Sequence, residues 1–496
     1  MCSDQAEHGD AGRLVRVDDR PHPFVGPVVD RQRKRDVDDD EAPWRSVVIH
    51  AAVLVAWIAL FVLAFVNGGV LAWSVGIAYI AYDTMLQGLV GWHTWKLGRP
   101  RASSSDVGTC SVGGIVAAHD ESRVLPATLA ALLAQDQPPE QIVIADDGST
   151  DETAQLLVER YGLAEPEIGA LSAPSVLHPA LTWLRLPRGG KARALNAAIV
   201  EVGTDVVLTV DADTLLDARA IGAVHRAFAN EAGLVAATGV ITPVCKATPA
   251  GRILDWFQTY EYIRNFLSRY AWMQVESLLL ISGAFAGFRR SAVLAVGGFD
   301  AACLVEDYEL IHRLRRHATE RGLDWRFRVL GGAQARTEAP GSVGAFLRQR
   351  RRWFGGFLQT QYWYRAMVGD PKCGRLGTWM LPVKAIDTLQ PLYGLTAFAL
   401  LVVYAASGRL AIVAPVAAII GAKIAIDLAF HLWSVHLYRR WVGDASRASL
   451  GWALTAAVAE PFTFQLLRHT GAALGWVAFL TGQRKWGRQT RFGLDA

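Results

Sequence analysis

The chain has 496 residues, of which 52% are hydrophobic, and its mean hydropathy is +0.21. It is therefore too long for one ordinary soluble domain and too apolar for two. Its formal net charge is only +4, and Lys and Arg cluster beside the apolar segments, which favours a membrane protein over one that binds nucleic acid. The five cysteines contain no C-x-x-C pair, so neither a disulfide framework nor a zinc site is indicated.

The N-terminal region divides into a polar tail and two apolar segments. Residues 1–45 mix acidic and basic side chains with prolines and show no hydrophobic period, which predicts a disordered tail and no signal peptide. Residues 46–95 predict two transmembrane helices, over 46–66 and 69–92, joined by a tight turn at Asn67 and Gly68. Basic residues flank both outer ends, so we expect that side to be cytoplasmic: Arg45, Lys96, Arg99 and Arg101.

The central region changes to a different pattern. Between residues 107 and 345, short apolar strands such as GGIVAAHD and QIVIADDG alternate with amphipathic helices such as SRVLPATLAALLAQD. This alternation predicts a parallel α/β sheet in one domain.

The C-terminal region returns to apolar sequence. We expect an interfacial helix within 346–375, transmembrane and interfacial helices over 376–482, and a basic cytoplasmic tail over 483–496. The last apolar stretch, 450–481, is interrupted by Glu460-Pro461 and Arg468-His469, so it predicts either one crossing with an interfacial helix or a re-entrant pair. The basic tail favours a cytoplasmic C-terminus and an even number of crossings.

Polar side chains follow the first two strands of the α/β region: His119, Asp120 and Glu121 after GGIVAA, and Asp146 and Asp147 after QIVIA. In an open α/β sheet, ligands bind beyond the carboxyl ends of the strands, so both clusters are expected at one crevice. The paired aspartates suit hydrogen bonds from a nucleotide base or ribose. The alternative is a strand-ending turn in which Ser149 or Thr150 caps the next helix.

The segment RGGKARALNAAI places Lys191 at the start of a helix that also contains Asn196. A lysine in such a loop can meet a phosphate group, which makes both residues candidates for binding a donor substrate. The alternative interpretation of this segment is an ordinary solvated basic turn.

The strand TDVVLTV runs into Asp211-Ala212-Asp213. Alternation along an extended chain sends Asp211 and Asp213 to the same side, where two carboxylates can share Mg²⁺ or Mn²⁺. Such a cation neutralises a diphosphate leaving group. A D-x-D arises often by chance, but here it follows a strand that reads as buried.

Two later segments carry further candidates. Glu306 and Asp307 open a predicted helix, where acidic residues suit the helix dipole but a carboxylate also suits the role of general base. In QRRRW, the side chains of Gln349, Arg352 and Trp353 share one face of a predicted helix. Arg352 can hold a diphosphate and Trp353 offers a platform to a sugar ring, whereas an amphipathic interfacial helix is the simpler interpretation.

In chain order, the segments AAHDES, IADDGSTDET, GGKARALNAAI, VDADT, SGAFAGFRR, VEDYEL and QRRRW resemble the motif series of processive family 2 glycosyltransferases. That family includes the cellulose, chitin, hyaluronan and poly-N-acetylglucosamine synthases. The resemblance covers about residues 113–357 and implies a GT-A, Rossmann-like α/β domain on the cytoplasmic side, inserted between transmembrane α-helices. It implies a nucleotide crevice formed by His119, Glu121, Asp146 or Asp147, Lys191 and Asp211.

The same resemblance implies that Asp213 coordinates the metal and that Asp307 is the catalytic base. Glu306, Gln349, Arg352 and Trp353 would then line the acceptor end. The motif containing Asp307 reads Val-Glu-Asp where many members have Thr-Glu-Asp, and the C-terminal KWGRQTR resembles the tail motif of hyaluronan-type synthases only loosely. No segment after the membrane helices resembles a PilZ domain, so we expect no control by cyclic di-GMP through this chain.

The function that follows is an inverting transfer of sugar from a UDP-sugar to a growing β-linked polysaccharide at the plasma membrane, coupled to export. A partner protein in that export is compatible with the resemblance. Two alternatives stay open: a non-processive transferase that glycosylates a membrane lipid, and a non-catalytic subunit that binds nucleotide-sugar within an export complex.

Ionisable residues also occur inside the apolar stretches. Asp83 lies in the second, and Lys423, Asp427 and His431 recur every four residues in a later one, on one helix face. Such groups must face protein or water. Lys423 and Asp427 either pair with each other or line a channel for polymer.

Overall fold

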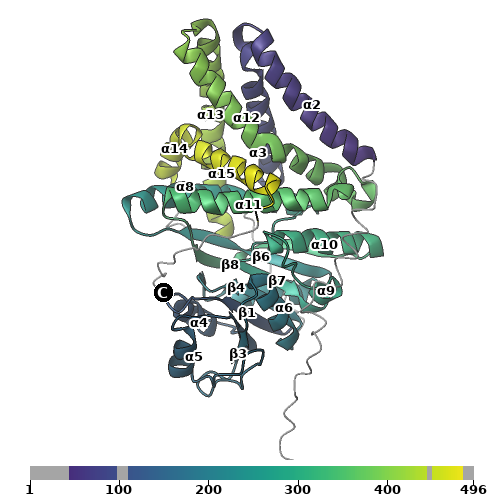
Figure 1. Ribbon diagram of the computed structural model, residues 1–496, viewed down its shortest axis with the longest axis vertical. Helices are drawn as coiled ribbons and strands as arrows, with labels where there is room; N and C mark the ends of the chain where they lie inside the picture. Colours follow the sequence, from purple (N-terminus) through teal and green to yellow (C-terminus); the bar gives the residue numbers. More distant parts are fainter. Residues whose placement is uncertain (1–43, 98–109, 444–448, 484–496) are drawn as a thin grey trace, which may run out of the picture.

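The structure is a computed structural model that describes residues 44–97, 110–443 and 449–483. The tails expected at 1–45 and 483–496 therefore lie almost wholly outside the described residues. Long apolar helices form one end of the molecule and an α/β domain forms the other, with further helices between them (Figure 1).

Four helices in the described part of the chain are long and apolar enough to span a membrane. They are α2 (Trp44–Val66), α3 (Ser74–Thr94) with the short helix η1 (Gly69–Trp73) before it, α12 (Leu381–Ala406) and α13 (Leu410–Val442). Only 6% of the most apolar window of α2 is buried, so most of its side chains face outward, as contact with lipid requires. Two of these helices precede the α/β domain and two follow it, as the sequence predicted.

The last apolar stretch forms two helices, and neither is among the four long apolar helices of the described residues. Helix α14 (Leu450–Ala459) ends at a 3₁₀ turn, η5 (Glu460–Phe462), and α15 (Phe464–Leu480) follows. The break falls at Glu460-Pro461, where proline cannot continue the hydrogen-bond ladder. Helix α15 lies along α11 (Val343–Trp363) and runs across the direction of α12 and α13 (Figure 1).

The α/β domain contains one eight-stranded sheet of order β3-β2-β1-β4-β7-β6-β8-β5. Its first four strands are parallel: β1 (Val112–Ala118), β2 (Gln141–Asp147), β3 (Leu181–Leu186) and β4 (Val206–Asp211). They are runs of buried apolar residues because helices cover both faces. The helices that follow the strands of this part of the chain are α4 (Leu125–Leu133), α5 (Thr153–Tyr161), α6 (Lys191–Glu201) and α7 (Ala220–Asn230).

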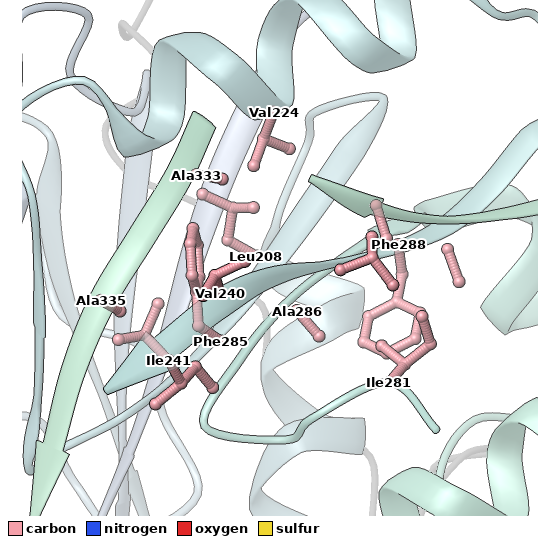
Figure 2. Packing of buried hydrophobic residues seen from close by; sticks show 14 of the residues in the cluster. Leu208, Val224, Val240, Ile241, Ile281, Phe285, Ala286, Phe288, Ala333 and Ala335 are labelled. Carbon is pink, nitrogen blue, oxygen red and sulfur yellow. The ribbon is translucent and has the colours of Figure 1, made fainter. Parts of the chain in front are cut away.

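The second half of the sheet corrects the expectation of a parallel sheet. It contains β5 (Thr214–Leu216), β6 (Leu234–Val244), β7 (Phe285–Arg289) and β8 (Arg326–Glu338). Strand β7 runs antiparallel to both β4 and β6, and β5 runs antiparallel to β8. The chain reaches β7 through the long helix α8 (Pro249–Gln274) and the segment after it, and enters the sheet from the opposite end. Figure 2 shows the core around Phe285 and Phe288 of β7.

Two more helices complete the domain: α9 (Arg290–Ala295) and α10 (Glu306–Arg321). Helix α10 begins at Glu306, where the sequence predicted a helix start, and ends at Gly322 with a left-handed φ of 63°.

Helix α13 connects the membrane end to the sheet. Its 33 residues extend about 50 Å, which exceeds the ~30 Å apolar thickness of a bilayer. Near its end, Trp441 packs close to Gly331 of β8, and the side-chain amide of Gln334 donates to the backbone oxygen of Val442 at 2.5 Å. The last turns of α13 are therefore part of the α/β domain.

The ionisable residues within the apolar helices pair with one another. Lys423 contacts Asp427 on its own helix, and its Nζ lies 2.6 Å from Oδ2 of Asp83 on α3. Gln87 donates to both Asp83 and Asp427, at 3.0 and 2.6 Å. This confirms the pairing alternative for Lys423 and Asp427, because ionic groups at this depth need partners.

Replacing Gly475 by alanine is expected to destabilise the protein by about 1–3 kcal/mol, because α11 and α15 approach too closely there for a side chain. A Cβ at Gly475 would lie 2.8 Å from Cβ of Phe354 and 3.0 Å from the backbone nitrogen of Gly355. Thermal unfolding of the protein in detergent measures the effect. Gly421→Ala in α13 is the control, since its added Cβ meets nothing within 4 Å. Equal melting temperatures for the two variants would contradict this packing.

Candidate active site

One large cavity of about 2040 Å³ lies at the carboxyl ends of β1, β2 and β4, where an open α/β sheet binds its ligands. Its walls also include one face of α8, the start of α10 and one face of α11. The cavity continues to α12 and α15 through Lys384, Gln390, Pro391, His469 and Ala472. It therefore reaches from the sheet to the helices at the membrane end.

Most of the residues singled out in the sequence line this one cavity. They are His119, Glu121, Asp147, Lys191, Asp211, Asp213, Glu306, Asp307, Gln349, Arg352 and Trp353. Asp146 and Asn196 are not among the lining residues.

The end of β1 is held against the turn that follows β2. Nδ1 of His119 donates to the backbone oxygen of Asp147 at 3.0 Å. Asp120, which has a left-handed φ of 55°, accepts from the backbone nitrogen of Thr150 at 2.7 Å. That hydrogen bond lowers the pKa of the Asp120 carboxyl. A non-glycine residue seldom adopts this conformation, so the hydrogen bonds of the turn must hold Asp120 in it.

The two aspartates at the end of β2 have separate tasks. Oδ1 of Asp146 accepts from the backbone nitrogen of Ser149 at 2.9 Å and so belongs to the turn. Asp147 accepts from the backbone nitrogens of Gly189 and Gly190, at 2.6 and 2.9 Å, and from Arg188 at 2.5 Å. Asp147 thereby shapes the glycine loop that leads to Lys191.

The helix cap after this turn differs from the expectation. Neither Ser149 nor Thr150 caps α5. Instead, Oδ1 of Asp151 accepts from the backbone nitrogen of Thr153 at 3.0 Å. Helix α5 begins at Thr153, as the sequence indicated, and its N-cap residue Glu152 makes no side-chain capping hydrogen bond.

Lys191, the first residue of α6, bridges two acidic segments. Its Nζ contacts Asp211 and lies 3.7 Å from Oε1 of Glu306. Burial alone would lower the pKa of Lys191, but the attraction of Asp211 and Glu306 outweighs burial and raises it. Lys191 is therefore a charged group at the centre of the cavity.

Asn196 has a structural partner. Its amide donates to the backbone oxygen of Phe299 at 2.8 Å and accepts from the backbone nitrogen of the same residue at 2.7 Å. This double hydrogen bond fixes the loop before α10. Of the two candidates on α6, only Lys191 lines the cavity.

Asp211 and Asp213 are the residues that the sequence predicted to hold a divalent cation. Asp211 ends β4, and Asp213 lies in the turn before β5, where Thr337 donates to it at 3.4 Å. Within the described ranges, no group of three or more His, Cys, Asp or Glu side chains is arranged to hold a metal. Two carboxylates nevertheless fit Mg²⁺ or Mn²⁺ when phosphate oxygens and water supply the remaining ligands.

Asp307 is oriented by backbone nitrogens at the start of α10. Its Oδ2 accepts from Gly283 at 2.7 Å and its Oδ1 accepts from Tyr308 at 2.8 Å. A Cβ at Gly283 would lie 3.0 Å from Oδ2 of Asp307, so a larger residue there would press on the Asp307 side chain. Burial raises the pKa of the neighbouring Glu306 carboxyl.

A buried ion pair joins α8 to the QRRRW segment of α11. Both terminal nitrogens of Arg350 donate to the two carboxylate oxygens of Glu261, each at 2.7 Å. The guanidinium of Arg350 lies 4.7 Å from the ring centre of Trp353. This ion pair therefore fixes the face of α11 that carries Gln349, Arg352 and Trp353.

The face of α8 is the part of the site that sequence reasoning missed. Tyr262, Asn265, Ser268 and Arg269 all line the cavity. Their spacing of three and four residues places them on one side of the helix. No motif marks them, and only this helical spacing of polar residues within EYIRNFLSR indicates a common face.

The membrane-side lining also differs from the channel hypothesis. Lys423, Asp427 and His431 are not among the described residues that line the cavity, whereas Lys384 and Gln390 of α12 are. The charges on α13 are used in pairing, so α12 and α15 form the wall of the cavity on this side.

Comparison with known proteins agrees with this architecture. Residues 206–418 match the family model described as glycosyl transferase family group 2. A mannosyltransferase from Pyrobaculum calidifontis, solved with GDP-Man and Mn²⁺, is 22% identical, covers 79% of this chain and 99% of its own, and superimposes with a TM-score of 0.50. The fold is of the GT-A type, and residues 206–418 are similar to family 2 glycosyltransferases.

The curated relatives that match this chain include synthases of a polysaccharide. Poly-beta-1,6-N-acetyl-D-glucosamine synthase of Staphylococcus epidermidis is 26% identical over 289 residues, which is 56% of this chain and 62% of the relative. The enzyme of the same name from Staphylococcus aureus strain COL is 29% identical over 245 residues, which is 49% and 53%. The chain thus spans between half and two thirds of the length of these relatives. The resemblance to processive family 2 glycosyltransferases, read from the motifs, is confirmed.

Removing the carboxylate of Glu261 is expected to destabilise the protein strongly, by about 3–5 kcal/mol, because Arg350 would be left buried without its partner. Glu261→Ala should therefore lower the melting temperature far more than Glu320→Ala. Glu320 pairs with Arg316 at 2.6 Å but is 52% exposed, and exposed pairs contribute about 0–1 kcal/mol. Thermal unfolding in detergent compares the two variants, and similar losses would show that the Glu261 pair is not buried as described.

Proposed function

We propose that this chain is an inverting glycosyltransferase that transfers sugar from a UDP-sugar to a growing β-linked polysaccharide. The observation that carries the proposal is that one cavity holds Asp211 and Asp213 near Lys191, holds Asp307 at the start of α10, and then continues to α12 and α15. The names of the curated relatives make UDP-N-acetylglucosamine the first donor to test.

The proposed chemistry has two parts, removal of a proton from the acceptor and stabilisation of the departing diphosphate. The acceptor hydroxyl loses its proton to Asp307 as its oxygen attacks the anomeric carbon of the donor sugar. The bond to the diphosphate breaks on the opposite face, so an α-linked donor gives a β-linked product. Lys191 and Arg352 offer positive charge to the departing diphosphate. A Mg²⁺ or Mn²⁺ ion held by Asp211 and Asp213 would supply further neutralisation of its charge.

We further propose that the protein is a multi-pass plasma-membrane protein with the α/β domain on the cytoplasmic side. Two potential crossings precede the domain and two follow it, and the α/β domain adjoins the end of α13 that carries Arg439 and Arg440. Basic residues next to membrane helices favour the cytoplasmic side. The proposed donor would then reach the cavity directly from the cytoplasm, and a separate export protein would be a partner at the opposite face.

A lipid-linked acceptor is the second candidate. It is favoured by the extension of the cavity to Lys384, Gln390 and His469, beside helices that could contact lipid. Product size separates the two: purified protein with a radiolabelled UDP-sugar panel and Mn²⁺ should give a high polymer for the polysaccharide and a short glycolipid for the lipid acceptor. Anomeric analysis of the product by NMR should show the β configuration, and an α product would contradict inversion.

Asp307→Asn should lower transfer by about 10²–10⁴-fold because it removes the proposed proton acceptor. It also removes one acceptor of a backbone hydrogen bond at the start of α10 but no proposed ligand of UDP or Mn²⁺, so UDP binding in the presence of Mn²⁺ should remain. Asp213→Asn should weaken both transfer and Mn²⁺-dependent UDP binding. Transfer assays and calorimetry measure the two effects. Asp324→Asn is the control, since Asp324 is 80% exposed and pairs only with surface Arg326. Full transfer by Asp307→Asn would contradict the role of Asp307 as catalytic base. Wild-type protein that binds UDP without transferring sugar would indicate a non-catalytic subunit.

A further inference from the structure

The cavity-facing side of α8 carries a set of hydrogen-bond donors that the proposed chemistry does not use. Asn265, Ser268 and Arg269 line the cavity at positions i, i+3 and i+4 of the helix. Helix α8 lies between the sheet and the apolar helices (Figure 1). These donors therefore belong to the wall that α8 contributes to the cavity.

Arg269 is the cation of this set, and it has no counter-ion in the described part of the chain. Its Nε and Nη1 atoms are covered by protein without a hydrogen-bond partner. Its guanidinium lies 4.3 Å from the ring centre of Phe266, a contact that leaves its donors unused. Burial lowers the pKa of Arg269 to about 10, so the group still carries its charge at neutral pH.

Two other buried arginines nearby each have an acidic partner. Arg350 has the carboxylate of Glu261, and Arg264 has Glu460 at 2.6 Å and His431 at 2.8 Å. An unpaired buried charge is costly to a protein, and such a cost is typical of functional sites. The contrast indicates that the partner of Arg269 arrives with a ligand.

The position of Arg269 indicates which ligand. The donor diphosphate already has Lys191, which pairs with Asp211. Among the carboxylates of the cavity, the one whose charge acts on Arg269 is Asp307, the group that would take the proton of the acceptor. Residues of α12 and α15 line the same cavity and offer a path for an acceptor or product.

We propose that Arg269, with Asn265 and Ser268, forms a subsite for an oxyanion carried by the acceptor. This oxyanion is the carboxylate of an acidic sugar chain or the phosphate of a lipid-linked acceptor, and a guanidinium binds either through paired hydrogen bonds. The inference rests on the proposed function, because it names the chemical class of the acceptor in the same cavity.

The test measures binding to the purified full chain in detergent, by thermophoresis, for two oxyanion probes and their neutral counterparts. The sugar pair is a β-linked glucuronic acid oligosaccharide and an N-acetylglucosamine oligosaccharide. The lipid pair is a polyprenyl phosphate and the corresponding polyprenol. Arg269→Gln should weaken one oxyanion probe by about tenfold or more, as expected for the loss of charged hydrogen bonds. Arg269→Lys should weaken it less.

The control variant is Arg252→Gln, which removes an exposed arginine of the same helix that does not line the cavity. It should bind every probe as the wild type does. Which oxyanion probe responds identifies the source, sugar carboxylate or lipid phosphate. Equal effects of Arg269→Gln on charged and neutral probes, or no effect on either oxyanion, would overturn the subsite.

Binding of UDP with Mn²⁺ separates this inference from the proposed function. Wild type and Arg269→Gln should bind UDP equally, and a large loss in the variant would instead assign Arg269 to the donor diphosphate. Absence of UDP binding to the wild type would contradict the proposed function. The effect of Arg269→Gln on binding of the oxyanion probes would still test the subsite. Without ligand, Arg269→Met should melt at the same or a higher temperature, whereas a marked decrease would show that the charge is satisfied within the protein and overturn the proposal.

Discussion

The ion pair between Glu261 and Arg350 holds together the two helices that close the cavity over the sheet. Both hydrogen bonds of the pair are 2.7 Å long, and the pair joins α8 to α11 in a setting from which water is largely excluded. A charged pair under these conditions is stable only when both members are present and well oriented. The faces of α8 and α11 that line the cavity are therefore set relative to each other by this contact, and Trp353 is held by the same guanidinium.

The two ends of the cavity are built by different means. The carboxyl ends of parallel strands bring His119, Asp147 and Asp211 to one edge of the sheet, and backbone nitrogens fix their neighbours. The opposite wall comes from helix faces, where side chains spaced by three and four residues project together. A donor wall made of strand ends and an acceptor wall made of helices suit a transferase, because one wall can accept a chain from the membrane side while the other keeps a nucleotide.

The connection to the membrane helices is direct. Helix α13 is long enough to leave the apolar layer and contact β8 through Trp441 and Val442, while α15 packs along α11. Movement of the apolar helices would therefore reach the cavity through packed side chains without a flexible linker. Pairing of Lys423 with Asp83 and Asp427 fixes α13 against α3 within that layer.

The sequence alone determined the features that depend on local pattern: apolar helices on both sides of an α/β domain, acidic residues at strand ends, a helix starting at Glu306, and the common face of Gln349, Arg352 and Trp353. These follow from periodicity and length, which are properties of neighbouring residues. The antiparallel entry of β7 depends on contacts between distant segments, and so do the division of labour between Asp146 and Asp147 and the attachment of Asn196 to Phe299. The sequence also could not show which face of α8 lines the cavity, because that depends on how distant segments pack.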